Sequence, residues 1–488
     1  MAVLSLEYQN RILTIPFTGA PILGELLAQQ GIQGFSPCGG MGKCGKCAVV
    51  LKGSVSAPSQ AELNFGTRLA CQARLIGDAY AKINPNTDFA HIQSDIKGFA
   101  VTEKADFAYG LAIDIGTTTV AGKLFDNNGN CLATQTAINP QRAFSADVLG
   151  RLSAALKGNA AVLQQQIAEC IEQLILNLCH SANITKTEIN STVITGNTAM
   201  LYLLQGIDVS SIATYPFIPK TLFGTTVTSP IKAYLPSCIN AFVGADITCG
   251  IIAAGMLNQT KTALLCDIGT NGELALYKNG ILYVTSAAAG PAFECANISC
   301  GCGYIAGAIE SVAVKDGGII AKTVGDKPAL GICGSGLIDA VATFVKAGYI
   351  DSEGNCSSSL RLSANGGTDY VNQDDIRALQ LAKSAVASAI ELLLNKTNTT
   401  PEEIDKVYLA GGFGNGIDIN SAAEIGIIPK KLAQKAVYAG NTALNGASQL
   451  LFNKNLGAEV KKVISTAKHI NLGGTEEFNQ AFIKNMAF

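Results

Sequence analysis

Short apolar runs alternate with polar turns over the first 83 residues, and this pattern predicts a small domain rich in strands. The stretch VLSLEYQNRILTIPF (3–17) has the form of two strands around a polar turn. Apolar residues at helical spacing over 20–33 predict an amphipathic helix that ends at Gly31. The run KCAVVLKGSV (46–55) predicts another strand. This succession fits a β-grasp domain, which we place at residues 1–83.

The rest of the chain has a different hydrophobic pattern. Residues 84–107 contain proline, polar side chains and no sustained period, which predicts a linker. Over residues 108–488 strands alternate with helical patterns, and this alternation predicts an α/β fold. Long helices are expected at 161–184 and 374–394, the second of them before the apolar strand KVYLA. One face of the first helix carries the apolar residues Ile167, Ile171, Leu174, Ile175 and Leu178.

An internal repeat divides this α/β region into two lobes. The stretches LAIDIGTTTVAGKLFD and LLCDIGTNGELALYK both place Asp-Ile-Gly-Thr after an apolar strand. Each continues as a strand to an Asn-Gly turn, which lies 14 residues after Asp114 and 12 residues after Asp267. We therefore predict two related lobes. The first covers about 108–263 together with a later return of the chain, and the second covers about 264–437.

Composition narrows the classes of function. The chain has 488 residues, enough for about three domains, and its net charge is −2 with 15% charged residues. It has no Lys/Arg-rich stretch of the kind that binds nucleic acid or an anionic membrane, and no apolar run of the ~20 residues that span a bilayer. The first residues lack the pattern of a secretion signal. Together with 15 cysteines, these features predict a cytoplasmic protein whose reduced thiols bind metal.

Three cysteines lie in the glycine-rich loop FSPCGGMGKCGKCAVVL. Five residues separate Cys38 from Cys44, two separate Cys44 from Cys47, and 23 separate Cys47 from Cys71. Three thiolates in one loop with a distant fourth are typical of a 2Fe-2S cluster, and the glycines let backbone amides approach the sulfides. Structural zinc is the alternative, although zinc sites usually pair two Cys-x-x-Cys motifs and only one occurs here. The region resembles 2Fe-2S ferredoxin domains, with Cys71 in the place of the fourth ligand.

The two Asp-Ile-Gly-Thr loops are candidates for phosphate binding. A strand that ends in Asp and turns at Gly-Thr directs backbone amides and hydroxyls toward phosphate oxygens, with the carboxylate placed to hold hydrated Mg2+. One such loop occurs in turns of many proteins. Two of them in a repeated context, followed by the glycine loop GGFGNG at 411–416, favour a nucleotide site. The alternative is a repeated hairpin without a ligand.

This constellation resembles the superfamily of actin, sugar kinases and Hsp70, which implies a two-lobed ATPase fold with ribonuclease H-like repeats. In that superfamily two phosphate loops hold ATP between the lobes, and a Gly-Gly turn receives the adenosine. The implied first phosphate loop comprises Asp114, Gly116, Thr117, Thr118 and Thr119. The implied second loop comprises Asp267, Gly269, Thr270 and Asn271. The implied adenosine contacts are Gly411, Gly412, Phe413 and Gly414.

Two assignments stay open within this nucleotide site. We favour Asp267 as the group that positions the attacking water and Asp114 as the group on the metal side, but the sequence does not decide between them. The stretch GICGSGLIDA adds Gly334, Ser335 and Gly336 as candidates for the nucleotide pocket. Packing at the start of a helix explains its glycines nearly as well.

The order of ferredoxin-like domain, linker and actin-like ATPase resembles the reductive activators of corrinoid proteins in anaerobic methyl transfer. The stretches ITGNTAMLYLLQGI, SAAAGPAFE, AEIGIIP and AGNTALNGA also resemble this family. The resemblance implies ATP-dependent transfer of a low-potential electron from a 2Fe-2S cluster to Co(II) of a corrinoid protein, which restores Co(I). It implies ATP and Mg2+ as further cofactors, an upstream low-potential electron donor as a partner, and a homodimer as one option.

Other functions stay open on the sequence alone. The protein could donate electrons to another metalloenzyme, act as a small-molecule kinase whose cluster senses redox state, or carry electrons with a structural nucleotide. No clear sugar-binding signature supports the kinase. Cys295, Cys300 and Cys302 lie close together in FECANISCGCG, and ordinary thiols are favoured there over a second metal site or a redox sensor.

Overall fold

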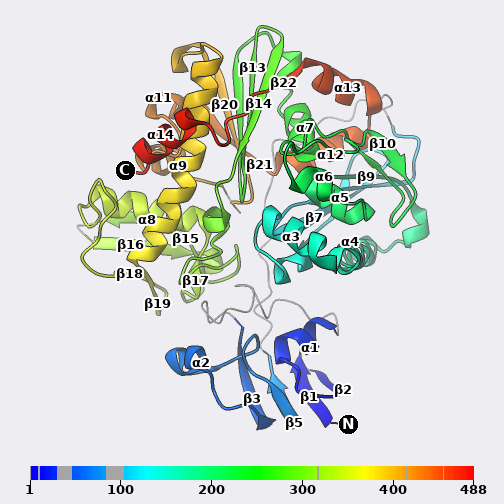
Figure 1. Ribbon diagram of the computed structural model, residues 1–488, viewed down its shortest axis with the longest axis vertical. Helices are drawn as coiled ribbons and strands as arrows, with labels where there is room; N and C mark the ends of the chain where they lie inside the picture. Colours follow the sequence, from blue (N-terminus) through cyan, green and yellow to red (C-terminus); the bar gives the residue numbers. More distant parts are fainter. Residues whose placement is uncertain are drawn as a thin grey trace.

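The structure of the chain is a computed structural model, shown in Figure 1. A small N-terminal domain, drawn in blue, lies below two larger lobes that stand side by side in this view. The described residues are 2–8, 11–29, 47–83, 104–315, 318–413, 416–453 and 456–488. Among the helices in these ranges, none combines the length and the apolar character that crossing a membrane requires.

The N-terminal domain contains a five-stranded sheet in the order β2-β1-β5-β3-β4. Its elements are β1 (Ala2–Tyr8), β2 (Arg11–Phe17), α1 (Leu23–Gln29), β3 (Ala48–Val55), α2 (Gln60–Phe65), β4 (Arg68–Leu69) and β5 (Leu75–Lys82). β1 pairs antiparallel with β2 and parallel with β5, and α1 buries Leu23, Leu26 and Leu27 in the domain core. The predicted β-grasp domain is confirmed. The predicted helix end at Gly31 lies outside the described residues.

A buried carboxylate fixes the turn before β4. Ser59 and Glu62 cap each other's backbone amides at the start of α2, which fixes where this helix begins. Glu62 also accepts hydrogen bonds from Arg68 Nε at 2.8 Å and from the amide of Leu69 at 2.9 Å. Leu69 pairs with Ala48 at the start of β3. Two segments that are far apart in the sequence are therefore held side by side.

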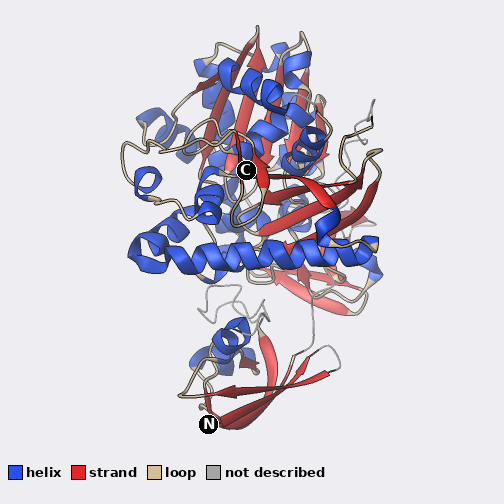
Figure 2. Ribbon diagram, turned by 90° about the vertical axis from the view of Figure 1, so that its right-hand side faces the viewer, coloured by secondary structure: helices blue, strands red, loops and turns tan. Residues whose placement is uncertain are grey.

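The first lobe contains a six-stranded sheet in the order β10-β11-β9-β6-β7-β8. Its strands are β6 (Tyr109–Ile115), β7 (Thr119–Asp126), β8 (Cys131–Ile138), β9 (Ile189–Gly196), β10 (Thr225–Val227) and β11 (Ala233–Leu235). Its helices are α3 (Val148–Ala154), α4 (Ala160–Ala182), α5 (Thr198–Gln205), α6 (Ser210–Ala213) and α7 (Ala245–Ala253). The predicted apolar face of α4 is confirmed, because its five residues are all buried in the core of this lobe. Figure 2 shows this helix lengthwise.

The second lobe contains a six-stranded sheet in the order β21-β20-β12-β13-β14-β22. Its strands are β12 (Ala263–Ile268), β13 (Gly272–Lys278), β14 (Ile281–Ala287), β20 (Lys406–Ala410), β21 (Ala436–Gly440) and β22 (Ala467–His469). Two smaller sheets comprise β15 (Ala308–Lys315), β16 (Gly318–Thr323), β17 (Gly331–Ile332), β18 (Leu360–Ala364) and β19 (Gly367–Val371). The helices are α8 (Gly334–Lys346), α9 (Gln373–Lys396), α10 (Ile419–Glu424) and α11 (Lys430–Ala433).

The two large sheets share one topology. The order β8-β7-β6-β9-β11 in the first lobe matches β14-β13-β12-β20-β21 in the second. In both, an antiparallel three-stranded meander precedes a long helix, and the next strand pairs in parallel with the first strand of the meander. The predicted two-lobed actin-like fold with ribonuclease H-like repeats is confirmed. The turn at Asn279 and Gly280 has positive φ at both residues, as a two-residue hairpin favours.

Two related helices join the lobes. α7 follows the last matching strand of the first lobe, and α12 (Thr442–Leu451) follows that of the second. The two helices approach each other closely at Gly250 and Gly446. A Cβ atom at Gly446 would lie 1.9 Å from the carbonyl oxygen of Cys249, and one at Gly250 would lie 3.0 Å from Oγ1 of Thr442. This close approach requires residues without side chains.

The chain crosses between the lobes again near its end. Leu444 and Leu450 of α12 and Val460 of α13 (Leu456–Thr466) pack with residues of β6, β7 and β9 in one core, so the C-terminal segment returns to the first lobe. β22 then extends the sheet of the second lobe, and α14 (Glu476–Lys484) packs beside α9. At the other end of the α/β region, Phe107 packs on Phe452 with ring centres 5.4 Å apart. Of the predicted linker, residues 84–103 lie outside the described residues.

Candidate functional site

Two of the four predicted cluster ligands lie within the described residues, and they lie on neighbouring segments. The backbone amide of Ala70 donates to the carbonyl oxygen of Cys47 at 2.8 Å, so Cys47 and Cys71 flank the pairing of β3 with β4. Both side chains are buried in the domain core. The side-chain amide of Gln72 lies 3.9 Å from Sγ of Cys71 and donates toward it. Cys38 and Cys44 lie outside the described residues.

The first phosphate loop follows β6 and is fixed by hydrogen bonds to its carbonyl groups. The amide of Gly116 donates to the carbonyl of Thr119 at 3.0 Å, which closes a tight turn. Nδ2 of Asn139 donates to the carbonyl of Gly116 at 2.9 Å, and Arg151 donates to the carbonyl of Thr117. Asn139 and Arg151 therefore fix the conformation of the loop through its carbonyl groups. The hydroxyl of Thr118 extends toward the second lobe, where it donates a hydrogen bond to Glu294.

Asp114 is the residue before the last one of β6 and is almost completely buried. Its Oδ2 accepts a hydrogen bond from Nδ2 of Asn441 at 2.8 Å, and Asn441 also caps α12 through the amide of Leu444. Burial raises the pKa of Asp114 to about 6, against the opposing hydrogen bond from Asn441. Asp114 is thus anchored to a helix that belongs to the return of the chain.

The second phosphate loop follows β12. The amide of Gly269 donates to the carbonyl of Asn271 at 2.9 Å, and the amide of Gly290 donates to the carbonyl of Thr270 at 2.8 Å. The hydroxyl of Thr270 donates to Oε2 of Glu294 at 2.8 Å. Glu294 ends the short 3₁₀ helix Pro291–Glu294, so this carboxylate belongs to the second lobe.

Five acidic residues gather where the two loops face each other. Burial raises the pKa of Asp267 to about 7, and the charges of Asp114 and Glu294 add to the rise. Burial and the charges of Asp114 and Asp267 raise the pKa of Asp246, at the start of α7, to about 8. Glu273 lies opposite Asp267 in the β12–β13 pair, and burial and its acidic neighbours raise its pKa well above the ordinary value. This is a buried site with an excess of negative charge.

These acids fit a site for hydrated Mg2+ and a phosphorylated ligand. Mg2+ prefers carboxylate oxygens and keeps several of its water ligands, and a cation would offset the repulsion that raises these pKa values. Within the described residues no three acids, histidines or cysteines are grouped to hold a metal by themselves. Of the two loop carboxylates, Asp114 is the one that we predict would hold such an ion.

Arg151 supplies a positive charge beneath the first loop. It is fully buried, and its three hydrogen bonds go to the carbonyl oxygens of Thr117 and Ser145 and to the sulfur of Met200. Burial and the charge of Arg142 lower its pKa to about 9. The charges of Glu294 and Asp147 oppose this shift, so the guanidinium has two carboxylates near it.

The segment Gly334–Gly336 begins α8, and close packing accounts for its glycines. A Cβ atom at Gly334 would lie 2.0 Å from the carbonyl oxygen of Phe293, and one at Gly336 would lie 2.1 Å from that of Ile309. Ser335 is buried, with its hydroxyl 3.3 Å from the sulfur of Cys333. Ligand contact by these three residues stays a prediction.

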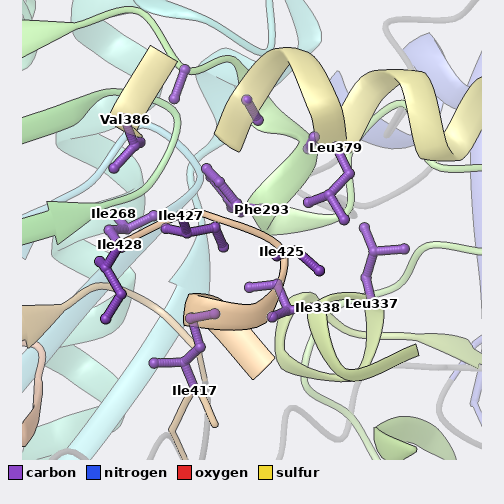
Figure 3. Packing of buried hydrophobic residues seen from close by; sticks show 14 of the residues in the cluster. Ile268, Phe293, Leu337, Ile338, Leu379, Val386, Ile417, Ile425, Ile427 and Ile428 are labelled. Carbon is purple, nitrogen blue, oxygen red and sulfur yellow. The ribbon is translucent and has the colours of Figure 1, made fainter. Parts of the chain in front are cut away.

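The predicted adenosine loop follows β20. Gly411 has φ +129°, and a Cβ atom there would lie 2.2 Å from the carbonyl oxygen of Ile268. At Gly412 a Cβ atom would meet no atom within 4 Å, so this residue borders open space. Phe413 is 4% exposed and packs against Phe293 with ring centres 6.3 Å apart. Figure 3 shows Phe293 among the core residues beside the helix that carries Leu379 and Val386. Gly414 lies outside the described residues.

Sequence reasoning missed several residues that the structure brings to this site. Asp246 comes from α7. Glu273 lies within the stretch LLCDIGTNGELALYK and Asn441 within AGNTALNGA, but neither was assigned a role. Alternation along β13 could have shown that Glu273 shares a face with the core residue Ala275, a signal that a buried acid there is unusual. Glu294 lies within the quoted stretch SAAAGPAFE, but its contact with both loops depends on the fold.

The three cysteines of FECANISCGCG lie at the edge of this region. Cys295 is buried, and Cys300 and Cys302 are half-buried. Within the described residues none of them belongs to a group that could hold a metal ion. A Cβ atom at Gly331 would lie 2.8 Å from Sγ of Cys302, so this thiol is packed against β17.

The fold and the site define a class of protein: an iron-sulfur domain joined to a two-lobed ATPase-like unit with paired phosphate-type loops. Family models agree along the chain. Residues 9–75 match the 2Fe-2S iron-sulfur cluster binding domain, 109–259 match the RACo middle region, and 261–488 match the C-terminal domain of RACo, the ASKHA domain. The N-terminal domain is therefore a 2Fe-2S cluster-binding domain, and its cofactor is a 2Fe-2S cluster.

Named relatives narrow the class to a family. The chain is 31% identical over 425 residues to the corrinoid activation enzyme RamQ of Eubacterium limosum, covering 79% of this chain and 71% of the relative. It is 24% identical over 422 residues to the [Co(II) methylated amine-specific corrinoid protein] reductase of Methanosarcina barkeri, covering 78% and 77%. A solved structure, the reductive activator for corrinoid, iron-sulfur protein, matches with a TM-score of 0.74 and 26% identity, covering 100% of this chain and 98% of that one. The chain belongs to this family of reductive corrinoid activators, which are redox enzymes.

Proposed function

We propose that this protein uses ATP, bound and hydrolysed between its lobes, to deliver a low-potential electron to a Co(II) corrinoid protein and restore Co(I). The observation that carries the proposal is the facing pair of Asp-Ile-Gly-Thr loops, joined through Glu294, in a chain that also has a 2Fe-2S domain. The names of the relatives support the acceptor, since one is a corrinoid activation enzyme and another a Co(II) corrinoid protein reductase.

The energetic reason for ATP lies in the two redox centres. Plant-type 2Fe-2S centres have potentials near about −400 mV, and the Co(II)/Co(I) couple of a corrinoid lies lower still. Each ~59 mV of mismatch makes a one-electron transfer tenfold less favourable at equilibrium. The cluster supplies the electron when it is bound. ATP hydrolysis then drives a change in the protein that allows the uphill transfer.

We assign separate roles in ATP binding and hydrolysis to the residues between the lobes. Backbone amides and hydroxyls of the two loops bind the phosphates, with Arg151 beneath the first loop adding positive charge. Asp114, held by Asn441 at 2.8 Å, would hold Mg2+, which would offset the charge of the phosphates. Asp267, with a pKa raised to about 7, is close enough to neutral pH to orient an attacking water and take up a proton. Gly411 and Gly412 receive the adenosine.

An anaerobic reduction assay tests this function. Chemically reduced protein is mixed with a Co(II) corrinoid protein, and formation of Co(I) is followed by absorbance with and without MgATP. We expect slow formation of Co(I) without nucleotide and much faster formation with MgATP. As a control, Cys47→Ser should lose or shift the visible spectrum of the cluster and lose Co(I) formation, while ATP hydrolysis remains.

Two results would contradict parts of the proposal. Equal rate and yield of Co(I) with and without MgATP would reject the ATP coupling. ATP-stimulated reduction of some other metalloenzyme, with no effect on any of a panel of corrinoid proteins, would reject the acceptor. Either result would leave the assignment of the cluster domain in place.

A further inference from the structure

Glu294 joins the two phosphate loops through one oxygen atom. Its Oε2 accepts a hydrogen bond from the hydroxyl of Thr118 in the first lobe and, at 2.8 Å, one from the hydroxyl of Thr270 in the second. Thr118 and Thr270 lie in the corresponding loops after β6 and β12, although the repeat aligns Thr270 with Thr117 and Thr118 with Asn271. The carboxylate therefore bridges the two phosphate loops, in addition to the packing of α7 on α12 and the contact of Asn441 with Asp114.

The chemistry of this bridge is that of an anion bound between phosphate loops. A carboxylate oxygen that accepts two hydroxyl donors makes charge-assisted hydrogen bonds, as a phosphate oxygen would. The same hydroxyls are the donors that the nucleotide site offers to phosphate. Two anions cannot share these donors at hydrogen-bond distance, because they repel each other in a buried site that already holds an excess of acids.

We propose that Glu294 is a latch, which takes the place of a phosphate oxygen in the nucleotide-free protein and must leave it when the terminal phosphate of a nucleotide binds. This inference rests on the proposed ATP site and adds to it a built-in competitor. The latch keeps the lobes joined when no nucleotide is present. A bound phosphate replaces the bridge and joins the same two hydroxyls itself.

The surroundings of Glu294 explain how its displacement reaches the rest of the second lobe. Residue 293, next to it, packs its ring on Phe413 of the glycine loop. The carbonyl oxygen of Phe293 faces Gly334 at the start of α8, where a Cβ atom would lie only 2.0 Å away. The 3₁₀ helix Pro291–Glu294 thus touches the adenosine loop and α8 as well as the second phosphate loop. Figure 3 shows Phe293 directed into the core that these elements share.

The latch predicts a direction of change in nucleotide affinity that other roles of Glu294 do not predict. A competitor that occupies the site lowers the apparent affinity for the nucleotide by the fraction of protein in which the site is free. Removing it should tighten binding. A residue that only stabilises the closed lobes should instead weaken binding when it is replaced, and a residue that only orients water should leave binding unchanged.

The test is nucleotide binding by the full-length protein, measured by calorimetry with MgATP. Glu294→Gln keeps the shape of the side chain and removes its charge, and Glu294→Ala removes the bridge entirely. We expect both variants to bind MgATP about tenfold more tightly than the wild-type chain, as for a latch closed about nine-tenths of the time. Glu310→Gln is the matched control, because Glu310 lies in the same lobe with its own partners Tyr304 and Lys322, and its affinity should equal that of the wild type.

The outcomes separate the latch from the proposed function. If the wild-type chain binds MgATP and the folded Glu294 variants bind it no more tightly, or more weakly, the latch is wrong while the ATP site stands. If wild type and both variants all fail to bind MgATP, the proposed ATP dependence fails and the latch fails with it. Thermal unfolding of each variant without ligand shows that the compared proteins are folded. Because two different substitutions are measured, the conclusion does not depend on the folding of a single variant.

Discussion

The two phosphate loops come from one repeat, yet they hold their acids differently. Asp114 lies opposite Ala121 in the β6–β7 pair, and Asn441 fixes its carboxylate at 2.8 Å. Asp267 lies opposite Glu273 in the β12–β13 pair, so a second acid shares its face of the sheet. The pKa of Asp114 rises to about 6 and that of Asp267 to about 7. The repeated loop therefore carries a carboxylate anchored by Asn441 in one lobe and a carboxylate that faces a second acid in the other.

The largest expected difference between the lobes is in ATP hydrolysis. Asp267→Asn should bind MgATP normally and hydrolyse it slower by a factor of about 100 or more, because it removes the group that orients the water and takes its proton. Asp114→Ala should instead lose Mg2+-dependent binding. Steady-state phosphate release and calorimetry distinguish the two. Hydrolysis by Asp267→Asn at the wild-type rate would show that the roles are assigned wrongly.

The next comparison concerns the helices that join the lobes. Gly446→Ala places a Cβ atom 1.9 Å from a backbone carbonyl oxygen, whereas Gly250→Ala places one 3.0 Å from a side-chain hydroxyl. Overpacking usually costs about 1–3 kcal/mol, so Gly446→Ala should lower the free energy of unfolding by about that amount and Gly250→Ala by less. Chemical denaturation of the two variants measures this. Equal losses would mean that the helices α7 and α12 adapt to both changes alike.

A smaller effect should separate two asparagines in related GNTA stretches. Asn197 and Asn441 each cap a helix, so replacing either with Ala should cost about 1 kcal/mol of stability. Only Asn441 donates to Asp114. Asn441→Ala should therefore also raise the pKa of Asp114. Asn197→Ala instead removes a hydrogen bond to the hydroxyl of Thr117 and should leave the pKa of Asp114 unchanged. An equal pKa of Asp114 in the two variants would count against its anchoring by Asn441.

The stability of the folded protein should also depend on pH. Asp246 and Asp267 have folded-state pKa values raised to about 8 and about 7 from 3.8. Between pH 3.8 and these raised pKa values the folded protein therefore binds more protons than the unfolded chain. Its free energy of unfolding falls as the pH rises over this range, and the fall is complete above about pH 8. The melting temperature without ligand should be lower at pH 8 than at pH 6. MgATP should reduce this difference in melting temperature between pH 6 and pH 8. A higher melting temperature at pH 8 than at pH 6 without ligand would contradict the prediction.

Local patterns predicted the fold and part of the site, and the reasons are visible in particular residues. The α4 face is recoverable because helical spacing alone decides which side chains are buried. The paired Asp-Ile-Gly-Thr loops are recoverable because the repeat places both at equivalent strand ends. Asp246, Asn441 and Glu294 were missed because their roles depend on how α7, α12 and the segment after β14 pack together. Burial decides pKa values here, and burial of a single acid cannot be read from its neighbours in sequence.

The central claim is that events at the second phosphate loop drive electron delivery. The most direct measurement is the rate of Co(I) formation by fully reduced Asp267→Asn protein at saturating MgATP, compared with the wild-type chain under the same anaerobic conditions. The variant should keep the cluster spectrum and bind MgATP, yet its rate should fall to the rate seen without nucleotide. A variant that hydrolyses ATP slowly but forms Co(I) with the full MgATP-dependent gain would contradict the claim.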